Sequence, residues 1–303
     1  MIELLKKKTN IDFMGKRIYS IVFSVIMLII GIVAVIQIAR GSANLGIDFA
    51  GGTAVQIKFN EHVPLNEVRD ALVNGGIKDF DLQDLPTENK VLIRVKKKDV
   101  ELGNLSKDIV SVLSRRFSES NVVVDSTTEI GPKVGARLRN DAMWAIIAAI
   151  AGILIYVSFR FKFRFGVGAT AATFHDVLAV LGIFYLMDKE INLVMVSALM
   201  MLAGYSLTDT VVVFDRIREN IRGRRKESTY NIINQSLNEV LSRTIITSLT
   251  TFFAAFALFL FGGEVIHDFA MAIMLGIIIG SYSSMFVASP IVYMFGDKAF
   301  SKK

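Results

Sequence analysis

The apolar run at residues 191–214 constrains the fold more than any other part of the sequence, because it is long enough to cross a bilayer as one helix. Asp209 lies inside this run. An ionised carboxylate in hydrocarbon is unfavourable unless protein or water shields it, and such groups usually mark the path of an ion or a substrate. We therefore predict a functional role for Asp209, with a paired, purely structural carboxylate as the alternative.

The other apolar runs predict a polytopic α-helical membrane protein with six transmembrane helices. A mean hydropathy of +0.50, with 22 Phe and only 4 Pro in 303 residues, excludes a large soluble enzyme. The sequence has no Cys, which excludes disulfides, thiol catalysis and Cys-ligated metals. The first predicted span is residues 18–39, and the other five, within residues 141–296, are residues 143–159, 165–187, 191–214, 244–261 and 269–295.

The distribution of basic residues predicts the orientation of these spans. Lys and Arg gather in residues 1–17, in the loop 215–242 and in residues 297–303, which the positive-inside rule places in the cytoplasm. The net charge of +6 follows from this asymmetry and gives no indication of nucleic acid binding. The run 18–39 is too long for a signal-peptide core and predicts an uncleaved first helix. Residues 228–241 are amphipathic and are predicted to lie along the cytoplasmic face as a short helix, either as a packing element or as a partner contact.

Residues 40–140 have the composition of a soluble α+β domain inserted between helices 1 and 2. Their periodicity predicts the order β-α-β-β-α-β, which matches a ferredoxin-like arrangement. Because the preceding helix starts in the cytoplasm, this domain is predicted to be external, in the periplasm or outside the cell. The expected strands are residues 53–59, 79–85, 91–95 and 122–130, and the expected helices are residues 65–74 and 105–117.

Four ionisable residues inside the predicted spans are candidates for ion coupling. Asp209 and Arg243 fall at a similar depth on consecutive antiparallel helices, so they can pair, and a proton arriving at Asp209 would release Arg243. His175 and Asp176 lie near the middle of the third span, where they could relay protons or only hydrogen-bond a neighbouring helix. We find no zinc-ligand spacing, serine triad or nucleotide signature, so no metal site is predicted.

Two further features have structural interpretations. Asp215 and Arg216 end the fourth span and are predicted to anchor its cytoplasmic boundary rather than carry ions. The Gly-rich residues 46–53 lack the Gly-Lys-Ser/Thr ending of a phosphate-binding loop and precede a strand rather than a helix. They are predicted to form the turn between the first membrane helix and the external domain.

Taken in order, residues 46–53, 174–177, 204–220 and 242–244 resemble the SecD/SecF family of bacterial protein export, in the resistance-nodulation-division superfamily. The resemblance covers nearly the whole chain and corresponds to the smaller, SecF-type member. It maps the membrane acid to Asp209 and the arginine of the fifth span to Arg243, while Thr208 stands where the family usually has Asn. The other motif positions are Gly46, Asp48, Gly51, Gly52, Thr53, Gly204, Tyr205, Ser206, Asp215 and Arg216.

The resemblance implies a role in transport rather than in catalysis. It implies a multi-pass subunit of the bacterial cytoplasmic (inner) membrane that forms a heterodimer with SecD beside the SecYEG channel, with YajC as a further partner. Such a complex is expected to use a proton or sodium gradient to promote late export of an unfolded polypeptide, after the ATP-driven stage. The coupling ion, H⁺ or Na⁺, is the only small species it implies; no cofactor is expected.

Three alternatives remain open at this stage. A resistance-nodulation-division type exporter of lipid or small molecules shares buried charges but normally has about twice as many spans in one chain. An intramembrane aspartyl protease could use Asp176 and Asp209, but the paired Tyr-Asp and Gly-x-Gly-Asp motifs of such enzymes are missing. In a scaffold subunit without an ion role, replacing Asp209 with Asn would be silent.

Overall fold

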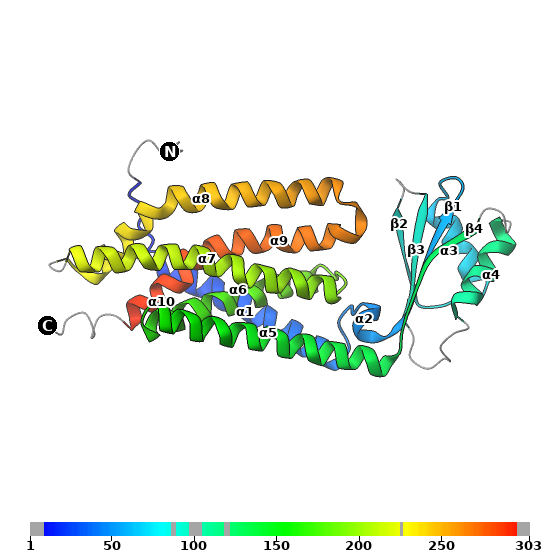
Figure 1. Ribbon diagram of the computed structural model, residues 1–303, viewed down its shortest axis with the longest axis horizontal. Coiled ribbons are helices and arrows are strands. Elements are labelled where there is room, and N and C mark those ends of the chain that lie inside the picture. The colour runs from blue at the N-terminus through cyan, green and yellow to red at the C-terminus, as the bar shows by residue number, and fades with distance from the viewer. Residues whose placement is uncertain (1–8, 86–88, 97–104, 118–121, 225–226, 296–303) are drawn as a thin grey trace.

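The computed structural model describes residues 9–85, 89–96, 105–117, 122–224 and 227–295. It has two parts, a bundle of long helices and a smaller α/β part at one end of it (Figure 1). Within the described residues, six helical stretches are long and apolar enough to cross a membrane, which confirms a polytopic helical membrane protein. They are α1 (Arg17–Arg40), α5 (Pro132–Arg160), α6 (Phe163–Leu186), α7 (Leu193–Gly223), α8 (Thr229–Phe261) and a last stretch that begins with α9 (Gly263–Ser283).

The last stretch is not one regular helix. After α9 the chain forms a π-helical turn, η3 (Ser284–Ala288), and then the short helix α10 (Ser289–Met294). The Ser289 hydroxyl donates to the Ser284 carbonyl across this turn, at 3.1 Å. Such turns inside a helix are frequent at functional sites, and nothing in the sequence analysis predicted this one.

Helix α6 forms the centre of the bundle. Its most apolar window is 72% buried, against 11% in α5 and in α8. Small side chains allow this, since they let neighbouring backbones approach closely. A Cβ added at Gly182 would lie 2.9 Å from the Gly31 nitrogen of α1. His175 and Asp176 of α6, which are 1% and 0% exposed, are therefore surrounded by protein on all sides.

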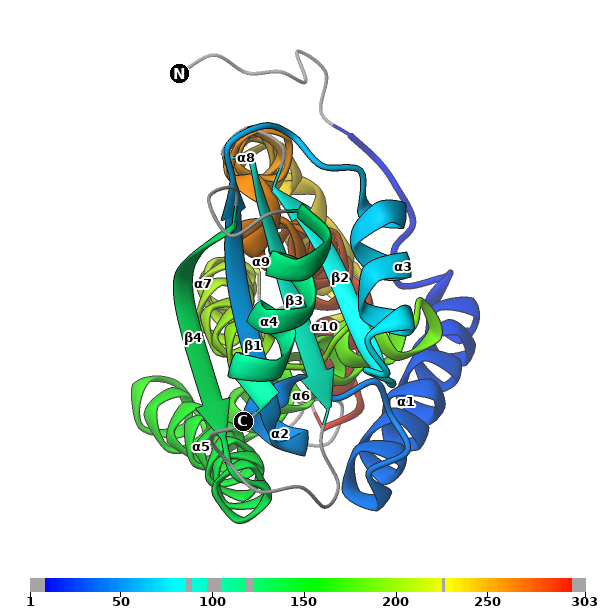
Figure 2. The same cartoon turned by 90° about the vertical axis from the view of Figure 1, so that its right-hand side faces the viewer.

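The α/β part is a four-stranded sheet with two helices on one face. The strand order is β2-β3-β1-β4, and every neighbouring pair is antiparallel. Figure 2 shows both helices on the face of the sheet turned away from the bundle. Val55, Ile57 and Phe59 alternate as buried residues of the central strand, as a half-buried strand requires. The elements are β1 (Gly52–Phe59), α3 (Leu65–Asn74), β2 (Phe80–Leu85), β3 (Lys90–Lys96), α4 (Leu105–Phe117) and β4 (Val122–Ile130).

Two helices extend beyond the spans predicted from the sequence. Helix α5 begins at Pro132, directly after β4. The predicted span begins only at residue 143, because the charged residues in the first turns of α5 lower the local hydropathy. Helix α8 is continuous over 33 residues, so residues 228–241 do not form a separate surface helix. No Gly or Pro occurs between Thr229 and Phe261 to break it.

Candidate functional site

Asp209 of α7 is held by a hydroxyl of α8. The Thr244 hydroxyl donates to Asp209 Oδ1 at 3.0 Å, so the predicted match in depth between the two helices holds to within one residue. The predicted partner was wrong: within the described part of the chain there is no ion pair between Asp209 and Arg243, and the Arg243 side chain is exposed. Consecutive helical residues point about 100° apart, so Thr244 and Arg243 do not face the same neighbour.

Asp176 is the most completely enclosed carboxylate of the bundle, with no exposed surface. Its Oδ2 atom accepts hydrogen bonds from Ser206 of α7 at 2.5 Å and from Ser283 of α9 at 2.7 Å. Its Oδ1 atom lies 3.0 Å from Nδ1 of His175, which is also buried. One carboxylate therefore joins three helices through polar contacts, which is how proteins make a buried charge tolerable.

Hydroxyl groups occupy the region between the two carboxylates. Ser284, the first residue of the π-helical turn, lies 3.1 Å from the hydroxyl of Thr210, the neighbour of Asp209. Ser284 also donates to the Gly280 carbonyl at 2.8 Å. Gly280 allows α9 to approach α7, since a Cβ there would lie 3.2 Å from Cβ of Ser206. We call Asp176, His175, Ser206, Ser283, Ser284, Thr210, Asp209 and Thr244 together the polar core.

Two atoms of the polar core retain unused hydrogen-bonding capacity. Asp209 Oδ2 and His175 Nε2 are buried, and neither has a hydrogen-bond partner among the described residues. Buried polar atoms without partners are rare in folded proteins. A carboxylate oxygen and an imidazole nitrogen can each take part in a further hydrogen bond, so these two atoms are where the polar core can still bind a polar group.

The outer side of α7 and α8 is polar at the level of Asp209. The Thr208 hydroxyl donates to the Gly204 carbonyl of its own helix, so Thr208 is not a partner of Asp209. Tyr205 donates to the Thr247 carbonyl of α8 at 3.3 Å. This outer polar strip consists of the exposed residues Gly204, Thr208, Arg243, Thr247 and Thr250. An arginine at this depth is poorly solvated by lipid, so the strip is suited to contact with protein.

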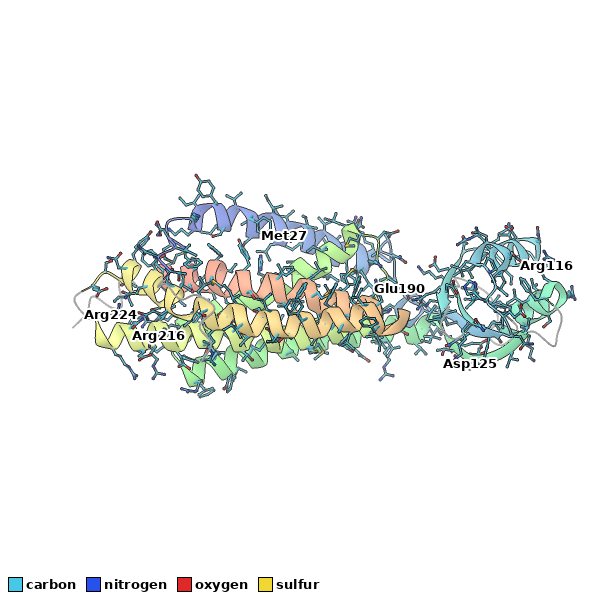
Figure 3. The ribbon with its side chains drawn as sticks, turned by 90° about the horizontal axis from the view of Figure 1, so that it is seen from above. Met27, Arg116, Asp125, Glu190, Arg216 and Arg224 are labelled. Carbon is cyan, nitrogen blue, oxygen red and sulfur yellow. The ribbon has the colours of Figure 1, made fainter. Side chains whose placement is uncertain are left out.

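The predicted boundary residues of α7 lie at the other end of the helix, where Figure 3 labels Arg216 and Arg224. Arg216 bonds Glu239 of α8 and Glu219 of its own helix, both at 2.6 Å, while Asp215 is exposed. Glu239 also accepts from Arg224 at 3.2 Å. These contacts fasten α7 to α8. Glu239 was not predicted from the sequence, because a contact between residues of different helices leaves no local sequence pattern.

The Gly-rich residues 46–53 form the predicted turn from the membrane helix to the sheet. Gly51 has a φ of 79°, and a Cβ there would lie 2.8 Å from Cα of Pro132, the first residue of α5. Only glycine fits both conditions. Gly52 and Thr53 begin β1. Gly46 and Asp48 do more than predicted, because they also bond the start of α7: the Gly46 amide donates to the Ile191 carbonyl at 2.9 Å, and Asp48 accepts from the Leu193 amide at 3.0 Å.

Glu190 lies beside this turn, between the bundle and the sheet (Figure 3). It forms an ion pair of 2.9 Å with Arg94 of β3, and the two side chains are 15% and 20% exposed. Burial raises the pKa of the Glu190 carboxyl above its ordinary 4.5, while Arg94 and Lys96 act in the opposite direction. Desolvation outweighs the attraction, as is common for buried ion pairs.

This pKa shift predicts a pH dependence of stability. Because the pKa of Glu190 is higher in the folded chain than in the unfolded chain, the folded chain binds more protons between the two values. The stabilisation that Glu190 adds to the free energy of unfolding is therefore complete below pH 4.5. It is lost as the pH rises through the raised pKa of the folded chain. Thermal unfolding across this range is expected to show a shallower pH dependence in Glu190→Gln, which is neutral at every pH. An unchanged slope would contradict the assignment.

Comparison with known proteins agrees with the class of protein that the fold and the polar core define, a polytopic membrane protein with ionisable groups inside its bundle. The family model for the protein export membrane protein SecD/SecF, C-terminal, matches residues 110–298, and the SecD/SecF GG motif matches residues 44–61. The chain therefore belongs to the SecD/SecF family of protein export membrane proteins.

Individual relatives are similar over the whole chain. The protein translocase subunit SecF of Thermodesulfovibrio yellowstonii is 56% identical over 100% of both chains. The subunit of the same name from Vibrio alginolyticus is 38% identical over 98% of this chain and 93% of the relative. The crystal structure of SecDF, a translocon-associated membrane protein from Thermus thermophilus, matches 97% of this chain at 32% identity with a TM-score of 0.80. The chain spans 40% of that SecDF chain.

Proposed function

We propose that this chain is the SecF-type subunit of a SecDF protein translocase, which uses an ion gradient to promote late export of unfolded polypeptides. The relatives named above support the translocase role. The observation that carries the ion role is Asp209, a carboxylate inside a membrane-spanning helix with one oxygen that lacks a hydrogen-bond partner within the described chain. Such a group takes up a proton without first breaking a contact of that oxygen.

The arrangement in the cell follows from the same proposal. The bundle lies in the bacterial cytoplasmic membrane with both termini in the cytoplasm, as the basic loops favour. The α/β part is then external. Its strand order and its β-α-β-β-α-β sequence support a ferredoxin-like domain, which is the class we propose for it.

SecD is the proposed partner in the membrane. The related SecDF chain is about two and a half times as long as this chain, so it contains a further part that has no counterpart here. We place that part against the outer polar strip on α7 and α8, where protein groups solvate Arg243 and Thr208 better than lipid does. The SecYEG channel, and YajC beside it, are the further partners of the assembly.

Proton uptake at Asp209 would act through local electrostatics. The ionised carboxylate accepts from Thr244 and attracts Arg243, the preceding residue on α8. The neutral acid attracts Arg243 much less, so the packing of α7 on α8 depends on the charge of Asp209. We propose a proton as the coupling ion and keep sodium as the alternative that the experiment tests.

The experiment compares export in vesicles that contain the chain, SecD and the channel, with ATP and with a proton or sodium gradient imposed separately. Asp209→Asn cannot ionise, so it is expected to keep ATP-driven export and to lose gradient stimulation. Arg243→Met is expected to show the same loss. Asp215→Asn is the matched control: it makes the same change at an exposed position of the same helix and is expected to keep the stimulation.

Full gradient stimulation in Asp209→Asn, at equal amounts of protein in the vesicles, would contradict the ion role and leave a scaffold subunit. Stimulation by sodium alone would replace the proton with sodium as the coupling ion. No observation favours the protease, since Asp176 and Asp209 accept hydrogen bonds from different hydroxyls rather than sharing one proton.

A further inference from the structure

We infer that Asp48, Arg94 and Glu190 are positioning residues that fasten the external sheet to the first turn of α7, so that movement of the Asp209 helix reaches the sheet directly. This inference rests on the proposed function and assigns a role to the Gly-rich motif, which the ion site leaves unexplained. We call the contacts among residues 44–52, residues 188–193, Arg94 and Lys96 the junction.

The first half of the junction binds the motif to the chain that enters α7. The Ile191 amide donates to the Asn44 carbonyl at 2.8 Å, and the Gly46 amide donates to the Ile191 carbonyl at 2.9 Å. Leu45 and Ile191 thereby form a parallel β-bridge, and both are buried. These bonds involve backbone groups only, so they hold the two segments in one register whatever their side chains.

Asp48 extends this attachment into the helix itself. It lies on a single helical turn, α2 (Ile47–Ala50), and its Oδ2 atom accepts from the amide of Leu193, the first residue of α7. Amides of the first helical turn have no partner within the helix. A carboxylate at this end is also favoured by the helix dipole. Asp48 is thus a cap for α7 that is supplied from another segment.

The second half of the junction binds the sheet. Arg94 of β3 forms the ion pair with Glu190, and Lys96 donates to the Asn44 side chain at 2.5 Å. Strand β1 begins at Gly52, within the Gly-rich motif, and pairs with β3 along its length. The sheet is therefore connected to the start of α7 through the chain itself and through two side-chain contacts.

The junction also includes the start of α5. Cβ atoms added at Gly51 and at Gly135 would meet the facing backbone at 2.8 and 3.0 Å, so these segments are in close contact. Rotation of the sheet about the motif alone would open that contact. From Leu193 to Asp209, α7 is one helix without Pro. A tilt of α7 at Asp209 is therefore passed to the junction rather than absorbed by a kink.

The test measures the integrity of the junction and the export activity in two separate assays. Hydrogen exchange of the Leu193 amide is followed in the purified chain with its SecD partner, and gradient-stimulated export is followed in vesicles. Asp48→Ala removes the acceptor, so exchange at Leu193 is expected to be about ten-fold faster, the effect of losing a hydrogen bond to a charged group. Gradient stimulation is expected to be lost in Asp48→Ala and in Arg94→Ala, with ATP-driven export retained.

Two control variants separate a role in transmission from general damage. Asp48→Asn keeps a carbonyl oxygen that can accept from Leu193, so it is expected to retain slow exchange and gradient stimulation. Asp125→Ala removes an ion pair of 3.1 Å with Lys90 inside the sheet, away from the junction, and is expected to retain both as well.

Faster exchange at Leu193 with full gradient stimulation would overturn the inference, and so would unchanged exchange in Asp48→Ala. The failure of the proposed function is a different result, since it requires a silent Asp209→Asn. A silent Asp48→Ala beside an inactive Asp209→Asn contradicts only the role of the junction.

Discussion

Replacing Asp176 with Ala is expected to lower the thermal stability of the bundle strongly. The change removes the acceptor shared by Ser206 and Ser283 and the partner of His175; Ser283 keeps the Gly280 carbonyl, while Ser206 and His175 lose this contact and stay buried. Each unpaired buried group costs about 1–3 kcal/mol, so a loss of about 3 kcal/mol or more is expected. For a chain of this size that corresponds to a melting temperature lower by roughly 5–10 °C, measurable in detergent with the purified chain.

The loss of thermal stability is expected at Asp176 and not at Asp209. Asp209 accepts from the Thr244 hydroxyl and is only half-buried, so Asp209→Asn is expected to keep nearly the native melting temperature. Asp176→Asn, which retains one carbonyl oxygen for the two serines, is expected to fall between native protein and Asp176→Ala. Equal melting temperatures for Asp176→Ala and native protein would show that the serines find other acceptors.

Replacing Gly31 with Leu is expected to separate α1 from α6. A Cβ at Gly31 would lie 2.7 Å from Cβ of Leu178, and the approach at Gly182 is equally close. A membrane offers no hydrophobic driving force to hold α1 in place, so the contact depends on close packing of small residues. Overpacking is expected to destabilise the chain by about 3 kcal/mol. The separation would be measured as a loss of oxidative crosslinking between one cysteine introduced into α1 and another introduced into α6. The native chain has no Cys, so no other disulfide can form.

Gly152 provides the matched control, because a Cβ there would meet nothing within 4 Å. Gly152→Leu introduces the same side chain into another membrane helix and is expected to leave both stability and crosslinking unchanged. Native crosslinking in Gly31→Leu would mean that α1 and α6 adjust without separating, contrary to the packing argument.

The sequence was sufficient to predict the membrane helices and the order of strands and helices in the α/β part, since these depend on local hydropathy and periodicity. It failed where polar residues continue a helix. The first turns of α5 and the polar N-terminal half of α8 are helical because nothing breaks them and because other segments pack on them. The Asn234 side chain, for example, accepts from the Phe13 amide at 2.8 Å, far away in sequence.

For the polar core, the sequence predicted which ionisable residues lie inside the bundle but not which side chains form hydrogen bonds with them. Depth along a helix follows from residue counting, so Asp209 was matched correctly to the start of the next span. Choosing between Arg243 and Thr244 requires the rotation of α8 about its axis, which only packing determines. Ser283 and Ser284 were missed because single hydroxyls are common in apolar helices; the adjacent pair was the available signal.

Helix α7 is fastened at three places along its length: by the junction at Leu193, by Asp176 at Ser206 near its middle, and by Glu239 at Arg216. Asp209 lies about 24 Å from the first residue of α7 and about 21 Å from the last. The helix is thus a lever whose fulcrum is the polar core. A tilt of about 10° at that fulcrum would move both ends by about 4 Å in opposite directions. Under the function proposed above, protonation of Asp209 would then pull on the sheet at one end of α7 while it loosens the contacts of α7 with α8 at the other end.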